Sequence, residues 1–153
     1  MKRKVLAVVL ALIPLFLMAR AATARTVDSR PLERHIRGLQ AQVSKVAPQS
    51  FTHKYPDGKL REQFTITPGG YAYASFDHSG VKMVEWSRTN DRIAYESWYA
   101  PGQTKERLLE DGRTISYTSF RKNGQKWEQY DFNKDKKVKS YAVYDKDGHL
   151  VQP

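Results

Sequence analysis

Cysteine is absent from this chain of 153 residues. Its absence excludes disulfide bonds, a cysteine nucleophile and a lipid anchor, because lipid attachment during export needs a cysteine at the cleavage site. A domain without disulfides has to be stabilised by its own hydrophobic core. Long hydrophobic runs are also scarce, with a single one from Val5 to Ala19.

The N-terminal residues have the pattern of a secretory signal peptide. Basic residues from Lys2 to Lys4 precede the hydrophobic run, and small residues follow it from Ala22 to Ala24. We therefore expect residues 1–24 to be removed by cleavage after Ala24 and the mature protein to be periplasmic or secreted. The alternative is a retained membrane anchor. It is disfavoured because the run has 15 residues, whereas a spanning helix needs roughly 20.

The charge balance is basic, with a formal net charge of +10. The first 24 residues hold four basic residues and no acidic one, so the remaining chain has 22 basic and 16 acidic residues, a net charge of +6. This excess favours anionic surfaces such as a phosphorylated glycolipid or a polyanionic glycan, or it simply keeps a small domain soluble. Nucleic acid is not an expected partner, because an exported protein rarely meets it.

Residues 25–50 form the next segment, in which the apolar spacing predicts an amphipathic α-helix from Asp28 to Val46. The apolar positions follow one another at intervals of 4, 3, 4 and 3, which places them on one helix face. They are Leu32, Ile36, Leu39, Val43 and Val46.

Asp28 or Ser29 is suited to cap this helix, and Pro48 ends it. Its outer face is basic, through Arg30, Arg34, Arg37 and Lys45. Such a helix either packs on its own domain or lies on a membrane surface. Packing is favoured because no Trp or Phe is present to insert into lipid.

Residues 51–153 are built on a repeat of turns. Five turn dipeptides have glycines 22, 22, 22 and 24 residues apart. They are Asp57-Gly58, Ser79-Gly80, Pro101-Gly102, Asn123-Gly124 and Asp147-Gly148, with further turn signals midway at Gly69-Gly70, Asn90-Asp91, Asp111-Gly112 and 133–136. We therefore predict a mainly β fold, an antiparallel meander of repeated β-hairpins preceded by one helix.

Apolar residues recur at the same period. Phe64, Trp86, Leu108 and Tyr130 are 22 residues apart, and so are Ser75, Ser97 and Ser119. Equivalent positions of a meander stand in rows across the sheet. We expect the four apolar residues to point the same way and to be buried.

The repeat resembles the 22-residue MORN-type repeat of bacterial antitoxin-like proteins. The resemblance rests on "YPDGKLREQF", "YAPGQTKERL", "FRKNGQKWEQY" and "YDKDGHLV", between Tyr55 and Val151. The last phrase is also similar to the tyrosine–aspartate repeats of large secreted toxins. The second repeat, "FDHSGVKMVEW", departs from the pattern. The resemblance implies a scaffold or antitoxin-like role in protein binding.

Catalytic and metal-binding signals are weak. The histidines His35, His53, His78 and His149 have no metal-ligand spacing, and we expect no metal or cofactor. Glu62, Glu106 and Glu128 are repeat-equivalent, with Glu85 one residue out of register. Paired carboxylates can hydrolyse glycosidic bonds, but interleaved Lys and Arg favour ordinary charge pairing on a solvated face.

Aromatic side chains are the remaining candidates for function. The candidate binding surface consists of Tyr73, Tyr95, Trp98, Tyr99, Tyr117 and Tyr141. Aromatics beside Lys and Arg suit sugar rings, peptide strands or a protein partner, unless the sheet curls over them. We thus expect an exported, non-enzymatic binding module with a protein partner, or alternatively with an anionic envelope polymer.

Overall fold

The structure is a computed structural model that describes residues 30–133 and 138–152. Three sequence predictions lie outside the described residues. They are the signal peptide 1–24, the caps Asp28 and Ser29, and nearly all of the turn at 133–136.

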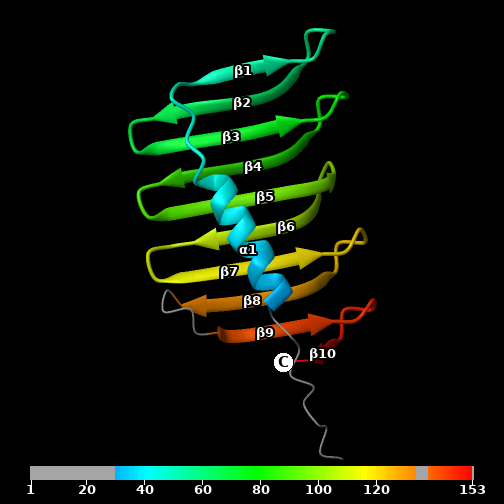
Figure 1. Ribbon diagram of the computed structural model, residues 1–153. Helices are drawn as coiled ribbons and strands as arrows, with labels where there is room; N and C mark the ends of the chain where they lie inside the picture. The colour runs from blue at the N-terminus through cyan, green and yellow to red at the C-terminus, as the bar shows by residue number, and fades with distance from the viewer. Residues whose placement is uncertain (1–29, 134–137, 153) are drawn as a thin grey trace, which may run out of the picture.

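One helix precedes a single ten-stranded sheet (Figure 1). The elements are α1 (Arg30–Val43), β1 (Phe51–Lys54), β2 (Leu60–Thr67), β3 (Gly70–Phe76), β4 (Lys82–Thr89), β5 (Arg92–Ala100), β6 (Gln103–Glu110), β7 (Thr114–Phe120), β8 (Lys126–Asn133), β9 (Val138–Tyr144) and β10 (Leu150–Gln152). Each strand pairs with its neighbour in the chain, and every pairing is antiparallel. The predicted β-meander is therefore confirmed.

The repeated glycines form the tight turns along one side of the sheet. All five have a positive φ, for example +85° at Gly58 and +84° at Gly124. Residues with a side chain rarely adopt this conformation, whereas glycine does so at little cost. The 22-residue period therefore corresponds to two strands and two turns.

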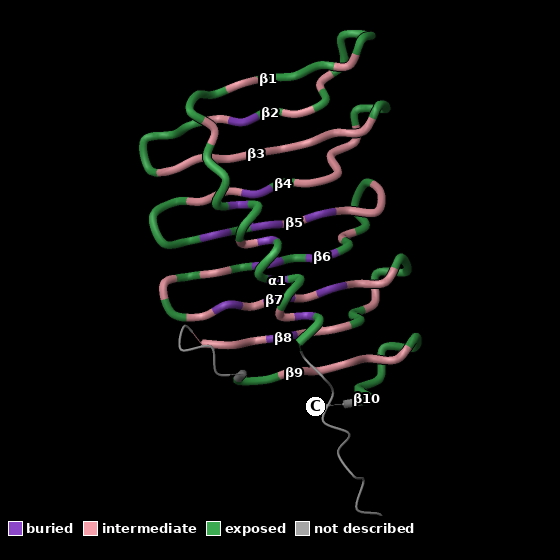
Figure 2. Tube along the Cα trace, viewed as in Figure 1, coloured by how far each residue is buried: buried purple, intermediate pink, exposed green. Residues whose placement is uncertain are grey.

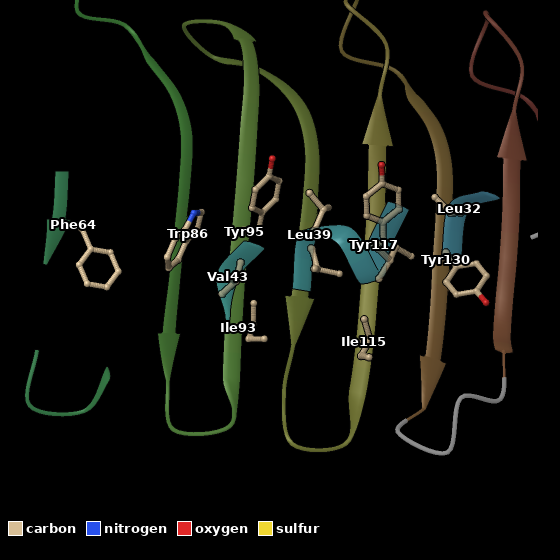
Figure 3. Close-up of a cluster of buried hydrophobic side chains, with 12 residues drawn as sticks. Leu32, Leu39, Val43, Phe64, Trp86, Ile93, Tyr95, Ile115, Tyr117 and Tyr130 are labelled. Carbon is tan, nitrogen blue, oxygen red and sulfur yellow. The ribbon is translucent and has the colours of Figure 1, made fainter. Parts of the chain in front are cut away.

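The aromatic residues form a continuous row across nine strands. Cross-strand partners connect Phe51, Phe64, Tyr73, Trp86, Tyr95, Leu108, Tyr117, Tyr130 and Tyr141 in that order. The four residues predicted to be buried are 0–4% exposed. These four residues lie on even-numbered strands, and the aromatic residues of the odd-numbered strands complete the row. Figure 3 shows its central members side by side.

Helix α1 lies diagonally across this row, from β8 at its N-terminus toward β4 at its C-terminus (Figure 1). Leu32, Ile36, Leu39 and Val43 are buried against the sheet, and the buried parts of the strands gather where the helix crosses them (Figure 2). The residues predicted to face the core are confirmed, except for Val46. None of the described helices has the length and apolarity needed to cross a membrane.

The prediction that the helix reaches Val46 is wrong. The helix ends at Val43, where the Ser44 hydroxyl donates to the Gln40 carbonyl at 2.8 Å. Val46 is 58% exposed. It belongs to the link that leads from α1 to β1, so four apolar side chains, not five, attach the helix to the sheet.

Candidate functional site

A row of carboxylates and serines runs beside the aromatic row, on the same face of the sheet. Cross-strand partners place Glu62, Ser75, Val84, Ser97, Glu106, Ser119 and Glu128 in that order. Each glutamate of the row accepts a hydrogen bond from a tyrosine of the following strand, at 2.9–3.2 Å. The pairs are Tyr73 with Glu62, Tyr117 with Glu106 and Tyr141 with Glu128.

Glu106 is the glutamate of this row that α1 covers. It is 5% exposed. Its Oε2 atom contacts His35 Nε2 at 2.5 Å and accepts from the Tyr117 hydroxyl at 3.0 Å. Its Oε1 atom accepts from Ser97 at 3.2 Å and from Tyr95 at 3.5 Å. Both carboxylate oxygens are therefore fully engaged.

The two partners shift each other's protonation. The hydrogen bond to Glu106 raises the pKa of His35 above its ordinary value, although partial burial opposes this. Burial alone raises the pKa of Glu106, but the hydrogen bond and charge of His35 and the Tyr117 hydroxyl outweigh it and leave that pKa lowered. The pair is thus an ion pair that joins α1 to β6.

The prediction of a solvated glutamate row is wrong for Glu106. Its repeat-equivalent on β4 is Val84, which cannot accept a hydrogen bond. Tyr95 is the tyrosine that would donate to a glutamate at position 84, and it donates to Glu106 instead. The out-of-register Glu85 faces the other side of the sheet, opposite Glu96.

The six aromatic residues of the predicted binding surface fall into two groups, two that are buried and four that are partly buried. Tyr95 and Tyr117 are buried beneath α1, so the prediction that they are exposed is wrong. Figure 3 shows their hydroxyls pointing toward the same end of the sheet. Both hydroxyls reach Glu106, and burial together with that charge raises both tyrosine pKa values.

The other four are partly buried. Tyr73 stacks on Trp86, with the ring centres 5.2 Å apart. Tyr141 meets Tyr130 edge to face at 5.8 Å. Trp98 and Tyr99 lie at the end of β5, where the Tyr99 hydroxyl donates to the Phe120 carbonyl at 3.2 Å.

Two hollows flank α1. One has a volume of about 190 Å³ and contains His35, Ser119, Trp127 and Glu128 among its lining residues. The other has a volume of about 310 Å³. It is lined by Glu33, Arg37, Gln40, Glu110, Ile115, Tyr130 and Phe132.

The opposite face of the sheet carries small side chains. A row of cross-strand partners consists of Ala72, Ser87, Ala94, Leu109, Ser116, Asp131 and Ser140. Side chains alternate between the two faces of a strand, and the neighbours of this row lie under α1. A hollow of about 610 Å³ lies around Ala94 and Leu109. None of the described elements packs on this face, which we call the bare face.

Metal chemistry has a single candidate among the described residues, in the turn between β9 and β10. Ligand atoms of Asp145, Asp147 and His149 lie within 4.8 Å of one another. The Asp145 carboxylate already accepts the backbone N–H groups of Asp147 and His149 at 2.8 and 2.9 Å. This is the hydrogen bonding of an aspartate-initiated turn, which explains the cluster without an ion.

Acid catalysis does not suit Glu106. A general acid needs a raised pKa so that it carries a proton near neutral pH, whereas the pKa of Glu106 is lowered. His35 lies at the flank of the apolar stripe, three residues after Leu32, and that position is the sequence signal for its contact with the sheet. Sequence reasoning missed both residues as partners.

No family model matches the chain, and no curated protein matches it in sequence. The geometry and chemistry of the described residues indicate three candidate surfaces. They are the bare face and the two hollows beside α1.

Proposed function

We propose that this protein is an exported, non-catalytic binding module that holds a protein partner on the bare face of its sheet. The observation that carries the proposal is the row of small side chains on that face, with Leu109 49% exposed among them. Alanine and serine let a partner approach closely over several strands. An exposed leucine supplies an apolar anchor for the centre of an interface.

Charged residues border this small-residue row. Arg107 pairs with Glu96 at 2.9 Å, and Glu85 is the cross-strand partner of Glu96. Leu109 is thus an apolar anchor with polar and charged side chains around it, and protein interfaces commonly have a polar rim. The rim gives directional contacts, and the hollow around Leu109 gives a partner side chain a place to insert.

The resemblance to MORN-type repeats supports the same proposal. A scaffold of that kind presents a sheet to another protein, and an antitoxin-like role is one form of such binding. The catalytic alternative has less support, because Glu106 is committed to fixing α1.

A photo-crosslinking residue at position 109 tests the proposal in living cells. We expect Leu109 to give a discrete adduct of higher mass, whereas the same label at Arg34, on the outer face of α1, gives none. Ala94→Arg should abolish the adduct, because it places a long charged side chain on the bare face. The absence of an adduct at Leu109, or equal adducts at both positions, would contradict the proposal.

Salt distinguishes a protein partner from an anionic polymer on this face. Screening at about 1 M salt shortens the Debye length to roughly 3 Å. An interface centred on Leu109 should survive this treatment, whereas binding of a polyanion should weaken steeply. The comparison is made by irradiating an envelope extract already held in about 1 M salt, and an adduct that still forms there supports the protein partner.

A further inference from the structure

The smaller hollow beside α1 contains a buried hydroxyl without a partner. Ser119 lies on β7 between Glu106 and Glu128 in the carboxylate row. It is 6% exposed, and its Oγ atom has no hydrogen-bond partner of ordinary distance and angle in the described part of the chain, although a weak contact with the Tyr117 hydroxyl opposes the rise of that tyrosine's pKa. A buried hydroxyl left unpaired costs about 1–3 kcal/mol. Because Ser119 lines the hollow, a bound molecule can supply the missing partner.

Trp127 also lines this hollow and is 46% exposed. The Arg121 guanidinium lies 5.4 Å from the centre of the Trp127 ring. Arg121 is itself held by the Tyr144 carbonyl, to which it donates at 2.9 Å. Arg121 thus contacts one side of the indole, while about half of the Trp127 side chain stays open to solvent.

The positive and negative side chains that line the hollow cancel one another's charge. Glu106 is neutralised by His35, and the lining holds one further cation, Lys105, and one further anion, Glu128. Among the described residues, Glu128 accepts one hydrogen bond, from Tyr141 at 3.2 Å, and a carboxylate has about four acceptor positions. The hollow therefore offers hydrogen-bond acceptors and donors without a strong net charge. A small ion gains little there, and a purely apolar ligand would leave Ser119 unpaired.

The volume limits the size of the ligand. At about 190 Å³, the hollow is smaller than the roughly 300–1,000 Å³ pockets that hold drug-sized ligands. This is space for one six-membered ring with its substituents. A sugar ring has the required chemistry, with an apolar face for an indole and hydroxyls for a serine and a carboxylate.

We infer that the hollow lined by Ser119, Trp127 and Glu128 binds one sugar ring of a glycan. The ring stacks on the open part of Trp127, and its hydroxyls pair with Ser119 Oγ and the Glu128 carboxylate. This site is separate from the bare face, so one chain can hold a glycan and a protein together. Sugar binding at this site does not depend on the proposed protein partner.

Titration of the folded mature protein tests the inference. The probes are methyl β-glucoside, N-acetylglucosamine and its β-1,4-linked tetramer, followed by NMR of the tryptophan indole N–H signals. We expect the Trp127 signal to shift with at least one probe. The buried Trp86 signal should stay unchanged.

Three variants locate the binding site. Ser119→Ala should weaken binding about tenfold, which corresponds to about 1.4 kcal/mol. Trp127→Ala should abolish measurable binding. Thr118→Ala, on the same strand but on the bare face, is the matched control and should bind like the parent protein.

The inference is overturned if none of the three probes shifts Trp127 at millimolar concentration. It is also overturned if Ser119→Ala binds as tightly as Thr118→Ala, since the unpaired hydroxyl is then not used. Leu109→Glu separates the two proposals, because it should remove the protein partner and leave the sugar titration unchanged. Thermal unfolding of each variant checks that the fold is intact.

Discussion

His35 of α1 and Glu106 of β6 are separated by 71 residues in the chain, yet their side chains meet at 2.5 Å. The contact is the polar counterpart of the apolar packing around Ile36, the next residue of the helix. Apolar burial is non-directional, whereas this ion pair requires one position of α1 along the sheet. The pair therefore sets where the helix lies, and with it the shape of both hollows.

Removing the Glu106 side chain should destabilise the protein strongly. Glu106→Ala strands three hydroxyl donors, and each buried polar group left unpaired costs about 1–3 kcal/mol. Glu62→Ala should cost below about 1 kcal/mol, because Glu62 is a partly exposed surface partner. Urea unfolding of both variants gives the comparison. Equal losses would show that the row acts as interchangeable surface charge.

The ion pair predicts a plateau of stability in mildly acidic solution. The pKa of His35 is raised from 6.5, so its contribution is complete below that value and is lost as the pH rises through the raised pKa. The pKa of Glu106 is lowered from 4.5, so its contribution is complete above that value and is lost as the pH falls through the lowered pKa. The plateau therefore spans about pH 4.5 to 6.5.

Unfolding measured across pH 4 to 9 for the parent protein and His35→Gln checks this plateau. The decline on the alkaline side should amount to below about 1 kcal/mol, because His35 is half exposed. Lys105 opposes the charge on His35, and Glu128 supports it. A decline of the same size in His35→Gln would assign the pH dependence to other groups.

Among the residues of the aromatic row, Trp86 on β4 should be the most sensitive to truncation of its side chain. It is 4% exposed, so Trp86→Ala should destabilise by about 3–5 kcal/mol. Trp86→Phe should cost below about 1.5 kcal/mol, because it also removes an indole N–H that is buried without a partner among the described residues. Thermal unfolding of both variants measures the difference. A small loss in Trp86→Ala would mean that the row is not the core.

The regular part of the fold was predictable because local rules determine it. The glycine of each turn needs a positive φ, as at Gly58 and Gly80, and the period of the turns then fixes strand length and pairing. Phe64 and Trp86 fall on one face as a direct consequence. The helix was predictable for the same reason, since its apolar stripe is local.

The carboxylate centre was not predictable, because it depends on how α1 lies across strands far away in the chain. Periodicity shows that Glu106 is equivalent to Glu62 and Glu128, but it does not show which of them the helix covers. The same limit applies to Tyr95 and Tyr117, which the sequence presents as surplus aromatics and α1 buries. Non-local packing thus decides which members of a repeat are core.

Export makes a separate prediction about the N-terminus. If Ala24 is the last residue of a signal peptide, the mature chain should begin at Arg25, because the peptidase reads small residues at its cleavage site. Intact mass and N-terminal sequencing of protein from the envelope or the culture medium measure this. A full-length chain that stays with the membrane fraction would contradict it.

Helix α1 should be required for the sheet to remain monomeric. It covers Leu108, Tyr117 and Tyr130, which are 0–3% exposed. The four apolar side chains that α1 buries contribute about 1.5–3 kcal/mol each, a sum comparable with the whole stability of a small domain, about 5–15 kcal/mol. Loss of the helix would also expose an aromatic row that runs across nine strands.

A mature chain that begins at Phe51 tests this requirement, with the complete mature chain as its control. We expect the shortened chain to self-associate in size-exclusion chromatography and to unfold at a lower temperature. Ile36→Asp gives the same test within the full chain, because it places a charge at a side chain that is 1% exposed. If the shortened chain is monomeric and equally resistant to heat, α1 is not part of the core. Its basic outer face, which includes Arg34 and Arg37, would then become the stronger candidate for a binding surface.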